Sequence, residues 1–217
     1  FSSKIKQHHG EQLSYNNYLD LESVISISRS LVIENNDLVS CVIVKHNNPC
    51  GAAYGKTSEE AWTSALASDP ESAFGCVVAF SHEVDLFTSQ KIGDHFVEAL
   101  IAPSITKEAL SFLSSKKRRR ILTFDFNIQK PNEDFQHRFV EGSLLSQKPI
   151  TNLEKIVLNK VGIISSRKIS PHESRLGIAV TRWTASNCVV LTNGSQTVGI
   201  GPGQTSRVEA VRIALRR

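Results

Sequence analysis

The residues best suited to chemistry lie at the end of an apolar stretch, in the sequence Lys45-His46-Asn47-Asn48-Pro49-Cys50-Gly51. The preceding run at 38–44 is rich in valine and isoleucine and predicts a buried strand, and Asn-Asn-Pro predicts a turn after it. A histidine can accept a proton near neutral pH, and a neighbouring ammonium group can stabilise a developing negative charge. The alternative is a polar strand end whose two side chains only meet water, and the motif alone does not decide between them.

A glycine-rich stretch at 199–207 is a second candidate, because it lies between a predicted strand and a predicted helix. Backbone N–H groups at a helix N-terminus can bind an anion, and Arg207 can add a bidentate contact to phosphate. Gln204 stands where a dinucleotide fingerprint would have its last glycine, so the stretch is not that motif. A plain tight turn is an equally good interpretation.

Two shorter stretches leave similar alternatives open. Gly75 can admit a ligand close to the backbone and Phe74 can offer a ring face, although a turn followed by a core phenylalanine explains them as well. Asn187 precedes an apolar strand, where its amide can recognise a carboxamide or cap the end of the preceding helix.

A zinc site of the deaminase type does not fit this sequence. His9-Gly10-Glu11 imitates H-x-E and Pro49-Cys50 imitates the start of P-C-x-x-C, but Ala53 stands where the second cysteine ligand would be. We therefore expect no zinc. The basic run at 116–120 has no interleaved aromatic residues and follows a predicted helix, which favours a solvated helix end over a nucleic-acid surface.

Composition predicts an ordinary globular protein. The 217 residues are 40% hydrophobic and 21% charged, with a formal net charge of +4 that suits anionic ligands. The four cysteines are scattered singly, and neither a secretion leader nor an apolar run of membrane-spanning length is evident, so we expect reduced thiols and a cytoplasmic protein with no membrane contact.

Alternating elements must position these residues. Helices are predicted at 20–33, with Asp20 near the cap, and at 57–66, 84–96, 105–116, from 170 and from about 205. Strands are predicted at 38–45, 73–80, 99–102, 121–124, 156–164, 187–191 and 197–201, the last two forming a hairpin. The pattern predicts a layered α/β protein with a largely parallel sheet, and the less regular stretch at 126–152 predicts a connection between two parts.

The Lys-His-Asn-Asn-Pro-Cys-Gly motif at 45–51 resembles the Lys-His-x-Asn-Pro-Cys-Gly motif of AICAR transformylase, the C-terminal domain of the bifunctional purine-biosynthesis enzyme that also carries IMP cyclohydrolase. Further matches follow in order over nearly the whole chain: Leu13-Ser14-Tyr15-Asn16-Asn17, Asp69-Pro70 with Ser72-Ala73-Phe74-Gly75, Phe96-Val97-Glu98 with Ile101-Ala102-Pro103, Lys116-Lys117, Ser186-Asn187, and Gly199-Ile200-Gly201 with Gly203-Gln204 and Ser206-Arg207-Val208.

This resemblance implies a fold and a reaction. The fold would be a cytidine-deaminase-like α/β subdomain at 1–125, the irregular connection at 126–152, and the beginning of a second, similar subdomain at 153–217. The reaction would be formyl transfer from 10-formyltetrahydrofolate to the 5-amino group of AICAR, in a homodimer. The chain would then be a fragment, without the cyclohydrolase domain and without the C-terminal part of the transformylase. The alternative is an inactive fragment that binds a purine ribotide without turnover.

The resemblance also implies roles for single residues. His46 would be the proton acceptor and Lys45 the stabiliser of the transition state. The positions that match contacts to AICAR are Gly75, Glu98, Asn187 and Arg207, with Phe74 lining the pocket. Val208 matches a position at the folate. A potassium site is implied near Thr184, Ser186 and Cys188.

Overall fold

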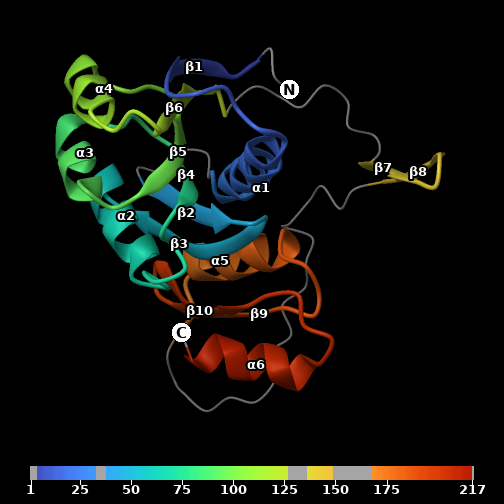
Figure 1. The fold of residues 1–217 in the computed structure, drawn as a ribbon. Coiled ribbons are helices and arrows are strands. Elements are labelled where there is room, and N and C mark those ends of the chain that lie inside the picture. Colours follow the sequence, from blue (N-terminus) through green and yellow to red (C-terminus); the bar gives the residue numbers. More distant parts are fainter. Residues whose placement is uncertain (1–3, 33–37, 127–135, 149–167, 217) are drawn as a thin grey trace. The chain divides into compact units, whose positions relative to one another are not determined.

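The computed structural model describes residues 4–32, 38–126, 136–148 and 168–216. Contacts divide the chain into one unit of residues 1–126 with 169–217 and a second unit of residues 127–168. The described part of the first unit is built on an eight-stranded sheet with the order β1-β6-β5-β4-β2-β3-β10-β9 (Figure 1). Its strands are β1 (Lys6–His9), β2 (Val39–Lys45), β3 (Asn48–Gly55), β4 (Cys76–Phe80), β5 (Val97–Ala102), β6 (Arg120–Thr123), β9 (Val189–Asn193) and β10 (Gln196–Gly201).

The sheet is mixed. Strands β4, β5 and β6 are parallel neighbours, whereas the other adjacent pairs are antiparallel. The predicted mixture of helices and strands is confirmed, and the predicted parallel pairing is found in these three strands. β2 and β3 are antiparallel because a two-residue turn joins them into a hairpin, and so short a connection cannot join parallel strands.

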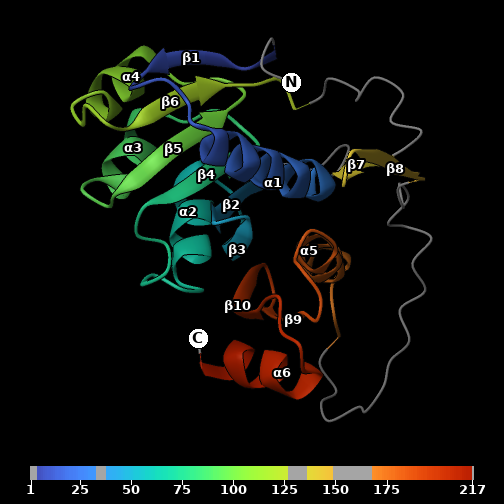
Figure 2. The same cartoon turned by 45° about the vertical axis from the view of Figure 1, so that its right-hand side comes forward.

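Helices cover both faces of the sheet (Figure 2). α1 (Tyr15–Leu31) packs on β2 and β4, and α5 (Pro171–Arg182) packs on β9 and on α1. α2 (Ser58–Leu66) packs on β3 and α6 (Arg207–Arg216) on β10, both against glycine-bearing strands. α3 (Leu86–Ile92) and α4 (Lys107–Leu113) pack on each other.

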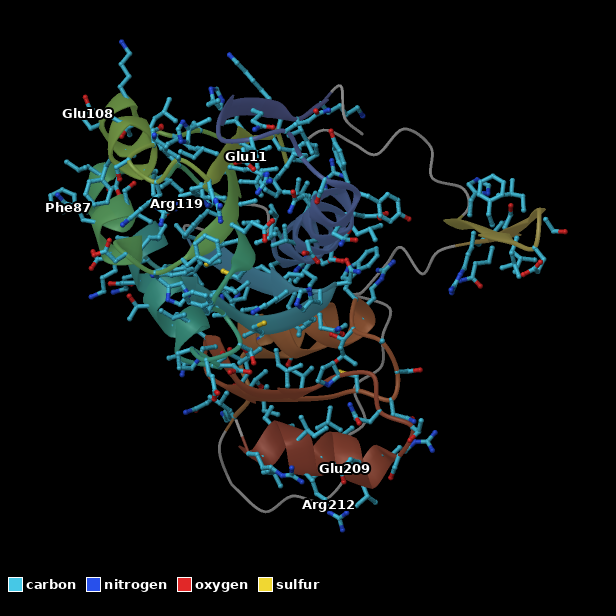
Figure 3. All side chains as sticks on the ribbon, in the orientation of Figure 1. Glu11, Phe87, Glu108, Arg119, Glu209 and Arg212 are labelled. Atoms are coloured by element: carbon cyan, nitrogen blue, oxygen red, sulfur yellow. The ribbon has the colours of Figure 1, made fainter. Side chains whose placement is uncertain are left out.

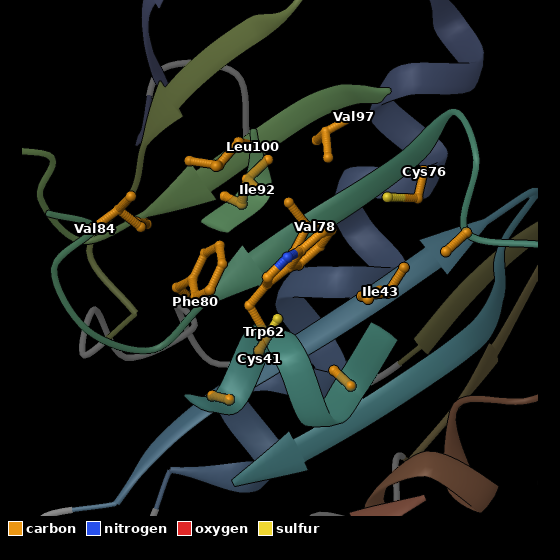
Figure 4. Packing of buried hydrophobic residues seen from close by; sticks show 14 of the residues in the cluster. Cys41, Ile43, Trp62, Cys76, Val78, Phe80, Val84, Ile92, Val97 and Leu100 are labelled. Atoms are coloured by element: carbon orange, nitrogen blue, oxygen red, sulfur yellow. The ribbon is translucent and has the colours of Figure 1, made fainter. Parts of the chain in front are cut away.

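Trp62 on α2 lies at the centre of the main hydrophobic core (Figure 4). It is 1% exposed and belongs to one cluster with residues of the sheet and of α3, among them Ile43, Val78, Phe80 and Ile92. Burial of each large apolar side chain contributes on the order of 1.5–3 kcal/mol. Cys41 and Cys76 share this core, and burial raises the pKa of the Cys76 thiol to about 12.

The first helix begins earlier than predicted. Ser14 is its N-cap: the Ser14 hydroxyl accepts from Asn17 N at 3.2 Å, and the Asn17 side chain accepts from Ser14 N at 3.0 Å. The prediction that placed Asp20 near the cap is therefore wrong, and Asp20 lies inside the helix. Residues 15–19 are largely polar, so the apolar periodicity appears only after the helix has begun.

Strand β3 was not predicted, because its Gly-Ala-Ala sequence has little β propensity. Its small residues serve the packing of α2. A Cβ added at Gly51 would overlap the carbonyl oxygen of Ala65, and one added at Gly55 would lie 2.5 Å from the backbone nitrogen of Ala61.

Other predicted features are largely present. Thr57 and Ser170 cap α2 and α5 by accepting from the backbone N–H three residues on. The predicted hairpin is formed by β9 and β10, with Gly194 at φ 64° in its turn. The elements predicted at 73–80, 84–96 and 105–116 are shorter in the structure, as β4, α3 and α4.

The second unit contains a hairpin of β7 (Gln136–Val140) and β8 (Ser143–Gln147), within the stretch predicted as an irregular connection. The strand predicted at 156–164 lies outside the described residues. β9 and β10 extend the sheet of residues 1–126, and the contacts place the unit boundaries after residues 126 and 168, with 169–217 in the same unit as 1–126. The assignment of 153–217 to a second subdomain stays a prediction. Among the described residues, no helix is long and apolar enough to cross a membrane.

Candidate functional site

The Lys45-His46 pair lies at the tip of the β2–β3 hairpin. Lys45 pairs with Asn48, so His46 and Asn47 form a two-residue turn. Their φ angles are 55° and 62°, both in the left-handed region that a type I′ hairpin turn requires. Histidine and asparagine tolerate this region better than most residues. The turn leaves the His46 side chain exposed and the Lys45 side chain half-buried at the end of the strand.

Lys45 connects this turn to the segment that precedes β4. Its Nζ donates to the carbonyl oxygen of Phe74 at 2.5 Å. Gly75 follows with φ 77°, and its N–H donates to Phe96 O at 2.7 Å. The ring centroids of Phe74 and Phe96 lie 5.3 Å apart. The structure therefore brings the predicted site residues Phe74 and Gly75 next to Lys45, and Phe74 is 61% exposed rather than part of the core.

Glu98 is the second residue of β5, and two side chains hold one of its oxygens. Asn17 Nδ2 donates to Glu98 Oε1 at 2.7 Å, and Arg120 Nη1 lies 3.3 Å from the same atom. Because both contacts use Oε1, the other carboxylate oxygen has no contact of this kind within the described part of the chain.

A pocket of about 330 Å³ lies beside the hairpin tip. It is lined by three parts of the first unit, the β2–β3 hairpin, the segment after α2 and the end of β10: Lys45, His46, Asn48, Pro49, Cys50, Asp69, Ser72, Ile200 and Pro202. Its volume is at the lower end of the range for small-molecule sites. The lining joins the Lys-His pair to the glycine-rich stretch, which lies far away in the sequence.

Asp20 is a site residue that sequence reasoning missed. Its Oδ1 accepts the backbone N–H of Asn47 at 2.7 Å, so α1 holds the left-handed turn. Burial raises the pKa of Asp20, while the backbone hydrogen bond from Asn47 and the charge of His46 oppose the rise. The signal that could have located it was Ser14-x-x-Asn17, whose cap moves Asp20 into the second turn of the helix.

The glycine-rich stretch is not an open anion cradle. Gly203 N donates to Ala185 O at 2.8 Å and Gln204 N donates to Asn187 O at 3.0 Å, so two of its N–H groups are already used. A Cβ at Gly199 or Gly201 would overlap a carbonyl oxygen of α6, which shows that these glycines permit the close approach of that helix. The tight-turn interpretation describes this stretch better.

The remaining predicted residues lie on and around the β10–α6 connection, residues 202–206. Asn187 Nδ2 donates to Gln204 O at 2.9 Å and to Thr205 O at 3.2 Å, so its amide nitrogen fastens the two loops together. Arg207 and Val208 begin α6 and are exposed. None of these three side chains is among the residues that line the pocket.

The predicted potassium position fits only in part. The Thr184 hydroxyl donates its hydrogen to Val180 O at 2.6 Å, so the lone pairs of its oxygen are not used by this bond. Hydroxyl oxygens such as those of Thr184 and Ser186 suit a hard cation, but the Cys188 thiol is a soft ligand and does not. Burial raises the pKa of Cys188, which keeps that thiol neutral.

These features define a mixed α/β protein with a lysine–histidine pair at a hairpin tip beside a small-molecule pocket. The family model described as AICARFT/IMPCHase bienzyme matches residues 2–217. The chain belongs to this family.

Curated relatives support the same assignment. The chain is 37% identical over 212 residues to the bifunctional purine biosynthesis protein PurH of Persephonella marina, and 39% identical over 214 residues to that of Lactococcus lactis subsp. cremoris. Each match covers 96% of this chain, but only 39% and 40% of the relative. The chain therefore spans about two fifths of the length of these relatives. A solved structure, Acinetobacter baumannii RibD, form 1, has a TM-score of 0.37 at 16% identity over 49% of this chain and 34% of that one, too low to support an argument about the fold.

Proposed function

We propose that the protein containing this chain acts in purine biosynthesis by transferring a formyl group from 10-formyltetrahydrofolate to the 5-amino group of AICAR. The family assignment and the names of the relatives support the pathway and the reaction. The observation that carries the proposal for this chain is the Lys45-His46 pair at the hairpin tip, beside a pocket and in contact with the Phe74-Gly75 backbone.

The chemistry of the reaction requires two groups of this kind. The lone pair of the AICAR amine is delocalised into the imidazole ring and its carboxamide, so the amine is a poor nucleophile. It must lose a proton as its nitrogen bonds to the formyl carbon, and His46 accepts that proton. The tetrahedral intermediate carries a negative oxygen, which the Lys45 ammonium group stabilises. The bond from carbon to N10 of the folate then breaks, and His46 returns the proton to N10.

The other predicted contacts divide into two groups. Gly75, Phe74 and the second oxygen of Glu98 are proposed to contact AICAR from the sheet side. Asn187, in the loop before β9, and Arg207, at the start of α6, are proposed to contact AICAR, and Val208, which is 58% exposed, to contact the folate. We also propose that the complete site is shared in a homodimer and that the hydroxyls of Thr184 and Ser186 contribute to a potassium site.

The test is AICAR-dependent release of tetrahydrofolate by this chain with its natural flanking sequence. His46→Ala is the test variant, and its rate is expected to fall by about 10²–10⁴-fold, the usual contribution of a positioned acid–base group. His82→Ala is the matched control, because His82 is also exposed but lies at the other end of β4, after Phe80.

A rate for His46→Ala equal to that of the wild type would contradict the role of His46. AICAR binding without any release of tetrahydrofolate by the wild type would contradict formyl transfer and would instead identify a ribotide-binding protein.

A further inference from the structure

The turn that carries His46 is conformationally costly. Two consecutive residues without glycine adopt left-handed φ angles, at 55° and 62°. Such a conformation costs on the order of 1–2 kcal/mol for a residue with a Cβ, and it persists only where neighbouring groups hold it. The contacts around the turn therefore determine where the imidazole lies.

Two hydrogen bonds hold this turn. Within the turn, Asn48 Nδ2 donates to His46 O at 3.0 Å. From outside it, the Asp20 carboxylate accepts the Asn47 N–H at 2.7 Å. Charged acceptors make the stronger hydrogen bonds. Asp20 is thus the group that fixes the turn to the body of the protein.

The position of Asp20 is itself fixed. It lies three residues after Asn17, so the two side chains share one face of α1. Asn17 closes the capping box with Ser14 and donates to Glu98. The first two turns of α1 therefore hold the turn that carries His46 and also the carboxylate of Glu98.

We propose that Asp20 is a positioning residue for His46: its carboxylate anchors the left-handed His46-Asn47 turn to α1 and so places the imidazole at the pocket. The inference rests on the proposed function, because positioning matters only if His46 acts on a substrate. The charged groups that act on Asp20 are His46 and Glu98, which lie on the turn and on β5.

The experiment compares Asp20→Ala and Asp20→Asn with Glu22→Gln, all in the chain with its natural flanking sequence. Glu22 is exposed on the same helix and is a control for the loss of one carboxylate. Asp20→Asn keeps the shape and one oxygen acceptor, so it separates the charge from the anchor. Steady-state rates give kcat and KM over a range of pH, and hydrogen exchange with mass spectrometry reports the amides of peptides that cover residues 44–50.

We expect kcat of Asp20→Ala to fall by about 10²-fold with little change in KM, because a misplaced catalytic group loses rate without losing binding. Exchange at the turn should rise about tenfold, as expected for the loss of a charge-assisted hydrogen bond. Asp20→Asn should lose less rate, because it keeps one side-chain oxygen that can accept the Asn47 N–H. Glu22→Gln should match the wild type in each measurement.

Two results would overturn the inference. One is unchanged exchange at the turn in both Asp20 variants, which would show that the carboxylate does not anchor it. The other is faster exchange with an unchanged kcat, which would show that the anchor does not position a reacting group. A wild-type enzyme without turnover would count against the proposed function instead, and the exchange data would still decide whether Asp20 holds the turn.

Discussion

The β2–β3 turn and the β10–α6 connection both carry residue types that bind ligands, but they are built in opposite ways. The turn uses no glycine, although both of its residues have positive φ angles, and a carboxylate from α1 holds it. The end of β10 and the connection after it contain three glycines, Gly199, Gly201 and Gly203, and the first two lie under α6 rather than facing a ligand. A strained position without glycine therefore points to a required side chain, whereas a glycine can mark packing alone.

α6 illustrates the packing side of this contrast. Its inner face lies so close to β10 that Gly199 and Gly201 have no room for a Cβ. Its outer face carries Glu209 and Arg212, whose side chains form an ion pair at 3.4 Å (Figure 3). Both residues are partly exposed, so this ion pair contributes little to stability.

The largest effect on stability should come from the packed glycine. Gly201→Ala should lower the free energy of unfolding by about 3 kcal/mol or displace α6, because its Cβ would overlap the carbonyl oxygen of Ala210. Gly177→Ala is the control: its Cβ would meet Thr192 at an ordinary 3.6 Å, and alanine is favoured by up to about 1 kcal/mol inside a helix. Urea denaturation measures both, and equal stability of the two variants would contradict the packing argument.

A smaller effect should come from the backbone of the turn. Asn47→Gly and Asn47→Ala both keep the N–H that Asp20 accepts, but only glycine adopts φ 62° without strain. The alanine variant should therefore be about 1 kcal/mol less stable than the glycine variant. Gly203→Ala should show a similar loss relative to the wild type, since Gly203 has φ 63°. Thermal unfolding of all three variants is the measurement, and a difference near zero between the two Asn47 variants would show that the turn relaxes in solution.

The smallest effect should be a pH dependence due to Asp20. Its pKa in the folded protein is raised above the ordinary value of 3.8, so the folded state binds this proton more tightly than the unfolded state. Stability of the wild type relative to Asp20→Asn should therefore fall as the pH rises from about 4 through the raised pKa, and should then stay constant. Denaturation at several pH values tests this, and a relative stability that increases over that range would reverse the assigned direction of the shift.

Sequence patterns predicted the elements that have a clear period or cap. β2 follows from its largely apolar run, and α2 and α5 follow from their N-caps, Thr57 and Ser170. Strand β3 was missed because its small residues make room for α2 rather than form an alternating apolar pattern. A contact with another element cannot be read from the periodicity of the strand itself. The start of α1 was missed because the reciprocal hydrogen bonds between Ser14 and Asn17 begin the helix at Tyr15, ahead of the apolar periodicity that starts at Leu21.

The site was predicted in its residue types rather than in its geometry. The Lys45-His46 pair was recognised, and so were Phe74 and Gly75, which the structure brings beside it. The left-handed turn and its anchor at Asp20 were not, because they depend on a contact between residues far apart in the sequence. The sequence of the glycine-rich stretch fitted both an anion site and a plain tight turn. The close approach of α6 to Gly199 and Gly201 favours the tight turn.

The most direct test of this contrast compares His46→Ala with Arg207→Ala in the formyl-transfer assay. If the turn carries the chemistry and the β10–α6 connection carries binding, His46→Ala lowers kcat by about 10²–10⁴-fold with KM for AICAR nearly unchanged. Arg207→Ala should then raise KM for AICAR by about tenfold or more, the loss expected for a charge-assisted hydrogen bond, with a smaller effect on kcat. A His46→Ala enzyme that keeps its kcat and loses only affinity would contradict the account.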